Sequence, residues 1–102
     1  MNKEVKKIIN QIVEGYNPEK IILFGSYANS KPGLASDIDL AVIKYTKDRF
    51  IDRLKKIAKI VKTWHAVDIL IYTPQEWQKG LDGEHYFIKE IAQKGKVLYE
   101  KR

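Results

Sequence analysis

The sequence has no cysteine, only three prolines, and no long apolar run. Without thiols, neither disulfides nor thiolate metal sites can form, and such a chain suits a reducing compartment; we expect a cytoplasmic protein. No stretch approaches the roughly 20 apolar residues of a membrane-spanning helix, and the N-terminus has no signal-peptide pattern. Membrane insertion and export are therefore not expected.

Charge is present in both signs but is not balanced. Nineteen basic and thirteen acidic residues give a net charge of +6 over 102 residues. A basic surface attracts nucleotides, nucleic acids or acidic proteins. Most of the lysines, however, lie on the polar faces of predicted helices, and no arginine–aromatic cluster typical of a nucleic-acid module is present. We therefore expect a solvated basic surface with a triphosphate ligand, rather than RNA or DNA binding.

Hydrophobic periodicity predicts one domain over residues 1–102, built from alternating helices and strands. Apolar, β-favouring runs predict strands over residues 21–24, 37–43, 66–72 and 96–99. Helical spacing predicts helices over residues 3–14, 47–62 and 84–94, with a further helix starting at the capping box Thr73-Pro74-Gln75-Glu76. The long helix between the second and third strands favours a right-handed crossover and parallel pairing. The fold class is α/β (α+β), with a small mixed sheet flanked by helices.

The helices carry further expectations. We expect Gly15 to end the first helix and Thr46 to cap the second. Arg53 and the lysines of the second helix should mostly face water. The inward positions of the second helix are predicted to be Phe50, Ile51, Leu54, Ile57, Ala58 and Val61, and those of the last helix Phe87, Ile88 and Ile91. We expect the helix that starts at Thr73 to be interrupted between Gly80 and Gly83.

Gly25-Ser26 follows the first strand directly, and Ser26 to Asn29 can begin a short helix. Free backbone N–H groups at a helix start bind anions, and glycine lets a phosphate approach the main chain closely. The Ser26 hydroxyl is an additional donor. This segment is a candidate phosphate cradle, although a Gly-Ser pair is common in ordinary turns.

Two carboxylates open the second strand, at Asp37 and Asp39. Strand geometry places them on one face, with Cβ atoms about 6–7 Å apart. Like charges that close repel, and hard divalent ions bind carboxylate oxygens; two ions about 3.5–4 Å apart fit this spacing. The alternative is a strand end at which Asp37 caps a turn and Asp39 is solvated.

Asp68 interrupts the third apolar strand, Ala66 to Tyr72. An unpaired buried carboxylate costs several kcal/mol, so a fold keeps one there only with a partner. If the third strand lies beside the second, Asp68 completes a site of three carboxylates. The alternative is an edge-strand aspartate that faces water.

Gly-Ser, ten intervening residues, Asp-x-Asp on a strand, and a further strand aspartate together resemble the nucleotidyltransferase superfamily of DNA polymerase β, and at this length its minimal nucleotidyltransferase (MNT) domains. The resemblance covers most of the chain. It implies that Gly25 and Ser26 hold a nucleoside triphosphate, and that Asp37, Asp39 and Asp68 bind two Mg²⁺ ions and catalyse the transfer. ATP would be the substrate, with the polymerase-β-like fold.

The resemblance also implies a partner. MNT proteins are commonly paired with a small helical HEPN protein, a ribonuclease-type toxin, and transfer AMP to one of its tyrosines. The hypothesis is therefore a Mg²⁺-dependent nucleotidyltransferase that acts as an antitoxin in a hetero-oligomer. One departure favours an alternative. The family often continues Gly-Ser-x-Ala with Arg-Gly, whereas this chain has Asn29-Ser30. The alternative is a catalytically inactive nucleotide-binding or structural subunit that neutralises a HEPN protein by binding.

Overall fold

The computed structural model describes residues 2–25, 28 and 37–102. Its elements follow the order α1 (Lys3–Tyr16), β1 (Lys20–Phe24), β2 (Ile38–Ile43), α2 (Phe50–Ile60), β3 (Val67–Tyr72), α3 (Pro74–Asp82), α4 (Tyr86–Lys94) and β4 (Lys96–Glu100). The short helix expected at residues 26–29 falls almost wholly outside the described part of the chain. The fold class predicted from sequence is confirmed.

The four strands form one mixed sheet in the order β3-β2-β1-β4. β1 is antiparallel to both β2 and β4, and β2 is parallel to β3. The parallel pair is joined through α2, as a long helical crossover requires. The predicted pairing of the second and third strands is therefore confirmed, and β3 is an edge strand.

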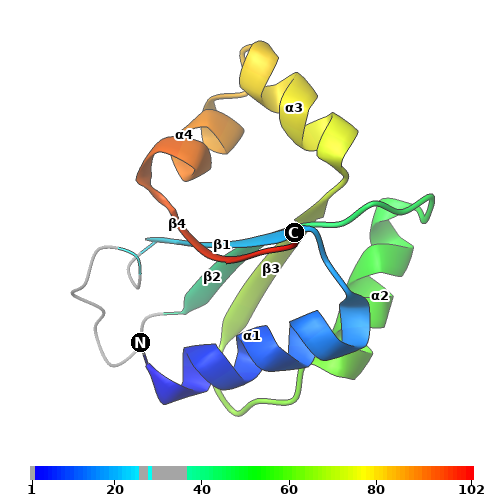
Figure 1. Cartoon of the computed structure of the whole chain (residues 1–102), viewed down its shortest axis with the longest axis vertical. Helices are drawn as coiled ribbons and strands as arrows, with labels where there is room; N and C mark the ends of the chain where they lie inside the picture. The colour runs from blue at the N-terminus through cyan, green and yellow to red at the C-terminus, as the bar shows by residue number, and fades with distance from the viewer. Residues whose placement is uncertain (1, 26–27, 29–36) are drawn as a thin grey trace.

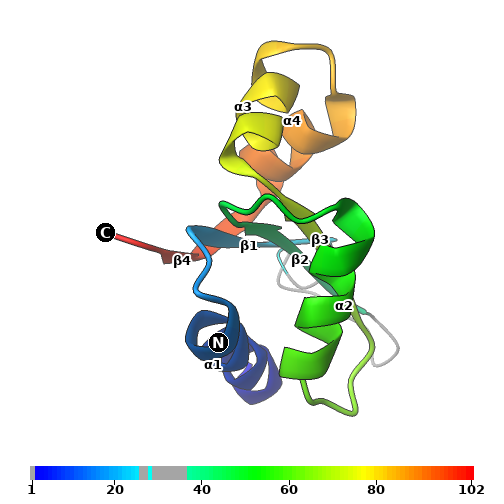
Figure 2. The same ribbon diagram turned by 90° about the vertical axis from the view of Figure 1, so that its right-hand side faces the viewer.

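The sheet is covered on both faces by two pairs of helices (Figures 1 and 2). Alternate strand residues point to opposite faces, which divides the apolar side chains into two cores. One core joins α1 and α2 to one face; its fully buried members include Ile8, Ile12, Ile21, Leu40 and Ile71. The other joins α3 and α4 to the opposite face and contains Ile22, Ala41, Ile43, Trp77, Ile88 and Ile91.

Several helix ends differ from the sequence expectation. α1 continues through Gly15 to Tyr16, and Asn17 ends it in the left-handed conformation with φ 50°. The helical glycine is instead a packing position, because an added Cβ would lie 2.8 Å from Ile60 Cγ2. Gly80 likewise does not interrupt its helix: it lies buried inside α3, beneath Ile88.

The prediction for α2 was wrong at its start. The helix begins at Phe50, and the Thr46 hydroxyl accepts from the Asp48 N–H in the preceding turn instead of capping the helix. Phe50 and Ile51 are 51% and 50% exposed, whereas Arg53 is only 7% exposed. Phe50 and Ile51 are therefore not core residues, and Arg53 is buried in their place. Ala58 is also exposed, so the buried stripe is narrower than predicted.

At the other end of the chain, the capping box of α3 is present as predicted, with Thr73 and Glu76 bonded reciprocally and Pro74 in the first turn. Phe87 was expected to face the core but is 43% exposed. No helix in the described ranges combines the length and apolar composition that crossing a membrane requires.

Candidate active site

The site is built where β1 ends and where β2 and β3 begin. Asp39 lies opposite Phe24 in the antiparallel pair and opposite Asp68 in the parallel pair. Ala41 and Ile43, two and four residues on, pack toward α3 and α4. Because side chains alternate along a strand, Asp39 belongs to that same face of the sheet. The sequence prediction that Asp39 and Asp68 come together is confirmed by this register.

Asp39 lies in an unfavourable electrostatic environment. Burial raises the pKa of its carboxyl above the ordinary value, and the nearby charges of Asp68 and Asp37 raise it further, together with a hydrogen bond between the Asp39 and Asp68 side chains. Each of these effects disfavours the ionised form of Asp39. A cation bound between the carboxylates of Asp39 and Asp68 would instead favour their ionised forms.

The two outer carboxylates are more open. Asp37 immediately precedes β2 and is exposed, and Asp68 is exposed on edge strand β3. Neither is buried in apolar surroundings, so the expectation that Asp68 needs a partner to offset burial was wrong. Its proximity to Asp39, rather than its own desolvation, makes it a site residue. An open edge leaves room for a second molecule to reach these carboxylates.

Gly25 closes one side of the site. Its φ is +73°, in the left-handed region that favours glycine. A Cβ built on it would lie 2.3 Å from Oδ2 of Asp39. Gly25 is therefore required both by its backbone conformation and by the approach of the Asp39 carboxylate. Ser26, the other residue of the predicted cradle, lies outside the described residues.

A cavity of ≈ 500 Å³ opens beside Asp39, within the range of small-molecule sites. Its lining comes from Phe24, Gly25, Asp39, Phe87, Glu90, Ile91 and Lys94. The four residues from α4 were not identified as site residues from sequence. Their helical spacing did signal a shared face, but such a stripe is more often read as core.

The residues present can be tested against a divalent metal. Asp39 and Asp68 offer hard oxygen donors at one point, and their mutual repulsion is what a cation relieves. In the described part of the chain, no group of three or more acidic or histidine side chains is arranged to hold one ion. The described residues thus bring Asp39 and Asp68 together and do not form the expected group of three around one ion. The two carboxylates fit a divalent ion, and the charge of Asp37 is near enough to raise the pKa of Asp39.

The sequence profile described as "Polymerase beta, Nucleotidyltransferase" matches residues 6–102 of this chain. The chain belongs to this family. It is a nucleotidyltransferase, and the resemblance drawn from Gly25-Ser26 and the three aspartates is confirmed at the family level.

Individual relatives agree. A candidate protein adenylyltransferase of Methanocaldococcus jannaschii is 29% identical over 97% of this chain and 100% of its own length. The fold matches a candidate nucleotidyltransferase of Sulfolobus solfataricus with TM-score 0.68 at 18% identity, covering 97% of this chain and 79% of that one. It also matches a toxin–antitoxin structure with AMP-PNP, with TM-score 0.71 at 23% identity, covering 99% and 76%. These last two likenesses concern the fold.

Proposed function

We propose that the protein is a Mg²⁺-dependent adenylyltransferase that transfers AMP from ATP to a hydroxyl of a separate protein. The observation that carries the proposal is the Asp39–Asp68 pair beside a cavity that also contains the Gly25 turn. The similarity to a candidate protein adenylyltransferase of Methanocaldococcus jannaschii supports it. So does the toxin–antitoxin neighbour whose crystal structure was determined with AMP-PNP.

The reaction would form one bond and break one. The acceptor hydroxyl oxygen bonds to the α-phosphorus of ATP, the bond from that phosphorus to the bridging oxygen breaks, and pyrophosphate leaves. Asp37, Asp39 and Asp68 would hold two Mg²⁺ ions, which would neutralise phosphate charge. Asp68 would accept the hydroxyl proton, a role supported by the exposure of its carboxylate on the edge strand.

Gly25 and Ser26 would position the leaving phosphates. Gly25 has no side chain to stand between a phosphate and its backbone, and its φ is left-handed, as in the turns that bind anions. The Ser26 hydroxyl would add a donor. Phosphoryl-type transfer depends mainly on such positioning and charge neutralisation.

The acceptor would be a tyrosine of a HEPN toxin, and the protein would act as its antitoxin in a hetero-oligomer. Toxin–antitoxin assemblies among the fold neighbours support a protein partner. The open edge at β3 supports access from outside, because Asp68 is exposed there.

Intact-mass spectrometry tests this proposal. The protein is incubated with its HEPN partner, ATP and Mg²⁺, and the partner is weighed. The expected result is a mass increase of one AMP that depends on Mg²⁺ and disappears when the acceptor tyrosine is changed to phenylalanine. An unchanged partner mass under these conditions contradicts the proposal.

A second candidate function is neutralisation of the partner by binding alone, without transfer. It is favoured by Asn29-Ser30 after the Gly-Ser-x-Ala segment, which provides no positive charge there. The same experiment separates the two: under this alternative the partner is inhibited in the complex while its mass stays constant. Binding without transfer would also persist in the absence of ATP.

A further inference from the structure

One face of α4 lines the cavity beside Asp39. Phe87, Glu90, Ile91 and Lys94 follow helical spacing and all border this space. The Phe87 ring packs edge-on against Phe24, with centroids 5.8 Å apart, and Ile91 is buried. Phe87 and Ile91 anchor α4 through these apolar contacts. Glu90 and Lys94 are the ionic groups that α4 presents to the cavity.

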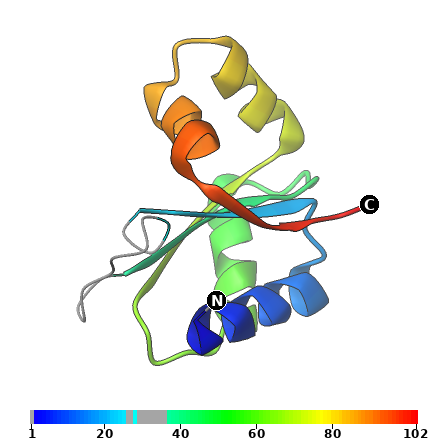
Figure 3. The same cartoon turned by 60° about the vertical axis from the view of Figure 1, so that its left-hand side comes forward.

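The carboxyl end of α4 lies against the end of β1 that leads into Gly25. The strand that follows α4 begins at Lys96, which is paired with Leu23. Between them, Gly95 approaches β1 so closely that a Cβ there would lie 2.6 Å from Ile22 Cγ2. Figures 1 and 3 show the same arrangement, with α4 running down to the sheet beside β1. Lys94 is therefore held near the phosphate end of the proposed site.

Charge at this cavity is poorly matched to a triphosphate unless Lys94 acts on it. The ionisable lining residues in the described chain are Asp39, Glu90 and Lys94, two anions and one cation. The carboxyl end of a helix adds partial negative charge. The sequence from Gly25 to Ser30 contains no basic residue. Besides the Mg²⁺ ions of the proposed reaction, Lys94 is the one cation among the described lining residues that can contact a polyphosphate at Gly25.

Lys94 is engaged but easily released. Its Nζ lies 3.2 Å from Glu90 Oε1, and the two side chains are 69% and 39% exposed. An exposed pair one helical turn apart contributes little to stability, and a lysine side chain redirects its ammonium readily. Exchange of the Glu90 carboxylate for a phosphate oxygen would therefore cost little.

We propose that Lys94 is the triphosphate-binding cation of this protein, held by Glu90 in the free state and transferred to the β or γ phosphate when ATP binds. This inference rests on the proposed function, because it requires the triphosphate to lie at Gly25 and Asp39. It assigns to α4 a role in distinguishing ATP from AMP. Glu90 then binds the Lys94 ammonium in the free protein, so its carboxylate competes with the nucleotide phosphates for Lys94.

Titration calorimetry of the full-length protein with Mg²⁺-ATP and with AMP tests the proposal. Lys94→Met should weaken ATP binding about five- to ten-fold, the range for one partly solvated charge pair, and leave AMP binding unchanged. The difference should shrink as salt is added. Glu90→Gln should tighten ATP binding, because it frees Lys94 and removes a negative charge beside the phosphates.

Lys79→Met is the matched control, since Lys79 also lies in the last turn of its helix, is exposed, and does not line the cavity. It should bind ATP as wild type does. Equal ATP affinity of Lys94→Met and wild type overturns the inference while leaving the proposed function standing. Weaker binding in Lys31→Ala, with Lys94→Met unaffected, overturns it in favour of Lys31, the first basic residue after Gly25 in the sequence. No binding of Mg²⁺-ATP by wild type overturns both.

Discussion

Asp39 is the residue at which stability and function oppose each other. Its carboxyl is partly buried beside Asp68 and Asp37, which raises its pKa above the ordinary 3.8. A raised folded-state pKa means that the native state binds more protons than the unfolded chain, so stability falls as pH rises from 3.8 through the folded pKa. At neutral pH, without metal, the ionised Asp39 destabilises the fold.

Asp39→Asn should therefore raise the melting temperature of the metal-free protein at pH 7 and abolish Mg²⁺-dependent ATP binding. The gain should vanish below about pH 3.8, where Asp39 is protonated in both states and nothing remains to relieve. Thermal melts from about pH 3 to 8 and calorimetry with Mg²⁺-ATP measure the two effects. Asp82→Asn, which changes an exposed carboxylate at the end of α3, is the control. Unchanged Mg²⁺-ATP affinity in Asp39→Asn contradicts the metal assignment.

Gly25 supports the same carboxylate through its backbone. In Gly25→Ala the new Cβ would meet Asp39 Oδ2, and an L-residue would be held at φ +73°. The left-handed conformation alone costs about 1–2 kcal/mol. We expect a loss of stability of about that size in chemical denaturation, together with weaker Mg²⁺-ATP binding.

Gly83→Ala provides the comparison for Gly25→Ala, because its backbone φ is −97° and the nearest atom to an added Cβ is a backbone oxygen at 3.2 Å. It should change ATP binding little. If Gly25→Ala binds Mg²⁺-ATP as wild type does, the close approach of Gly25 to Asp39 has no functional role.

Sequence reasoning at this scale brought Asp39 and Asp68 together through the neighbouring strands that it expected, and not through the burial that it expected of Asp68. Asp39 and Asp68 each interrupt an apolar run, and the parallel register places them side by side. It failed for Lys94 and Glu90, because a charged pair on a helix surface looks like ordinary solvated charge. Only the fold shows that this surface borders a cavity.

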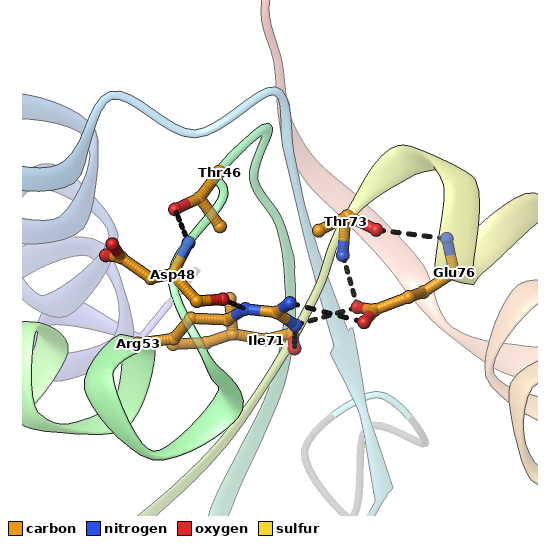
Figure 4. A network of polar contacts seen from close by, with 6 residues as sticks. All are labelled: Thr46, Asp48, Arg53, Ile71, Thr73 and Glu76. Atoms are coloured by element: carbon orange, nitrogen blue, oxygen red, sulfur yellow. Dashed lines mark hydrogen bonds and ion pairs between the residues drawn. The ribbon is translucent and has the colours of Figure 1, made fainter.

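At the scale of elements, a buried arginine joins α2 to the opposite helical layer. Arg53 donates to both carboxylate oxygens of Glu76 in α3, to the Ile71 carbonyl at 3.3 Å, and to the Asp48 carbonyl at 3.0 Å (Figure 4). Glu76 in turn accepts from the Thr73 N–H within the capping box. One guanidinium therefore ties α2, the end of β3 and the start of α3 together.

Glu76→Gln should destabilise the protein by about 0.5–1.5 kcal/mol, the net range for an ordinary hydrogen bond, because the Glu76 side chain is 47% exposed and solvent screens the ion pair. The hydrogen bond from Arg53 lowers the pKa of Glu76 below its ordinary 4.5. A lowered folded-state pKa gives stability that is present above pH 4.5 and is lost as pH falls through the folded pKa. The difference between wild type and Glu76→Gln, measured by urea unfolding, should therefore narrow in acid.

Glu84→Gln serves as the control, because Glu84 is an exposed carboxylate of the turn between α3 and α4. A difference in stability between wild type and Glu76→Gln that is constant from about pH 3 to 7 would show that the Arg53 ion pair is not its source.

Sequence alone placed Arg53 in solvent, since one arginine among lysines on a helix gives no sign of burial. Its partners Ile71 and Glu76 are 18 and 23 residues away in the sequence, and only the crossover from α2 to β3 brings them to Arg53.

At the scale of the whole molecule, the sheet order was predictable in part. The long helix between the second and third strands implied their parallel pairing, and within that pair the register brings Asp39 and Asp68 together. The antiparallel addition of β4 to the other side of β1 carried no such signal, because a five-residue terminal strand fits either sheet edge. That placement sets where α4 ends, and so where Lys94 lies.

The order β3-β2-β1-β4 also leaves Asp68 on an edge, with Asp39 one strand further in. A nucleotide held at Gly25, Asp37 and Asp39 would be approached by a second protein from the β3 side. In that arrangement, Asp68 would lie between the bound nucleotide and the incoming acceptor. In the proposed reaction the inner aspartates hold nucleotide, and the outer one serves the transfer.

Asp68→Asn should separate binding from chemistry. The remaining pair, Asp37 and Asp39, can still hold one ion with ATP, so calorimetry should find much of the Mg²⁺-ATP affinity retained. Loss of the proton acceptor should lower the transfer rate about 10²–10⁴-fold, the usual contribution of a positioned general base. Mass spectrometry of the partner over time measures that rate. The exposed position of Asp68 makes misfolding an inadequate explanation for the loss. Because removing its charge relieves repulsion of Asp39, the variant should melt at no lower temperature than wild type. Transfer at the wild-type rate by Asp68→Asn would exclude Asp68 as the base.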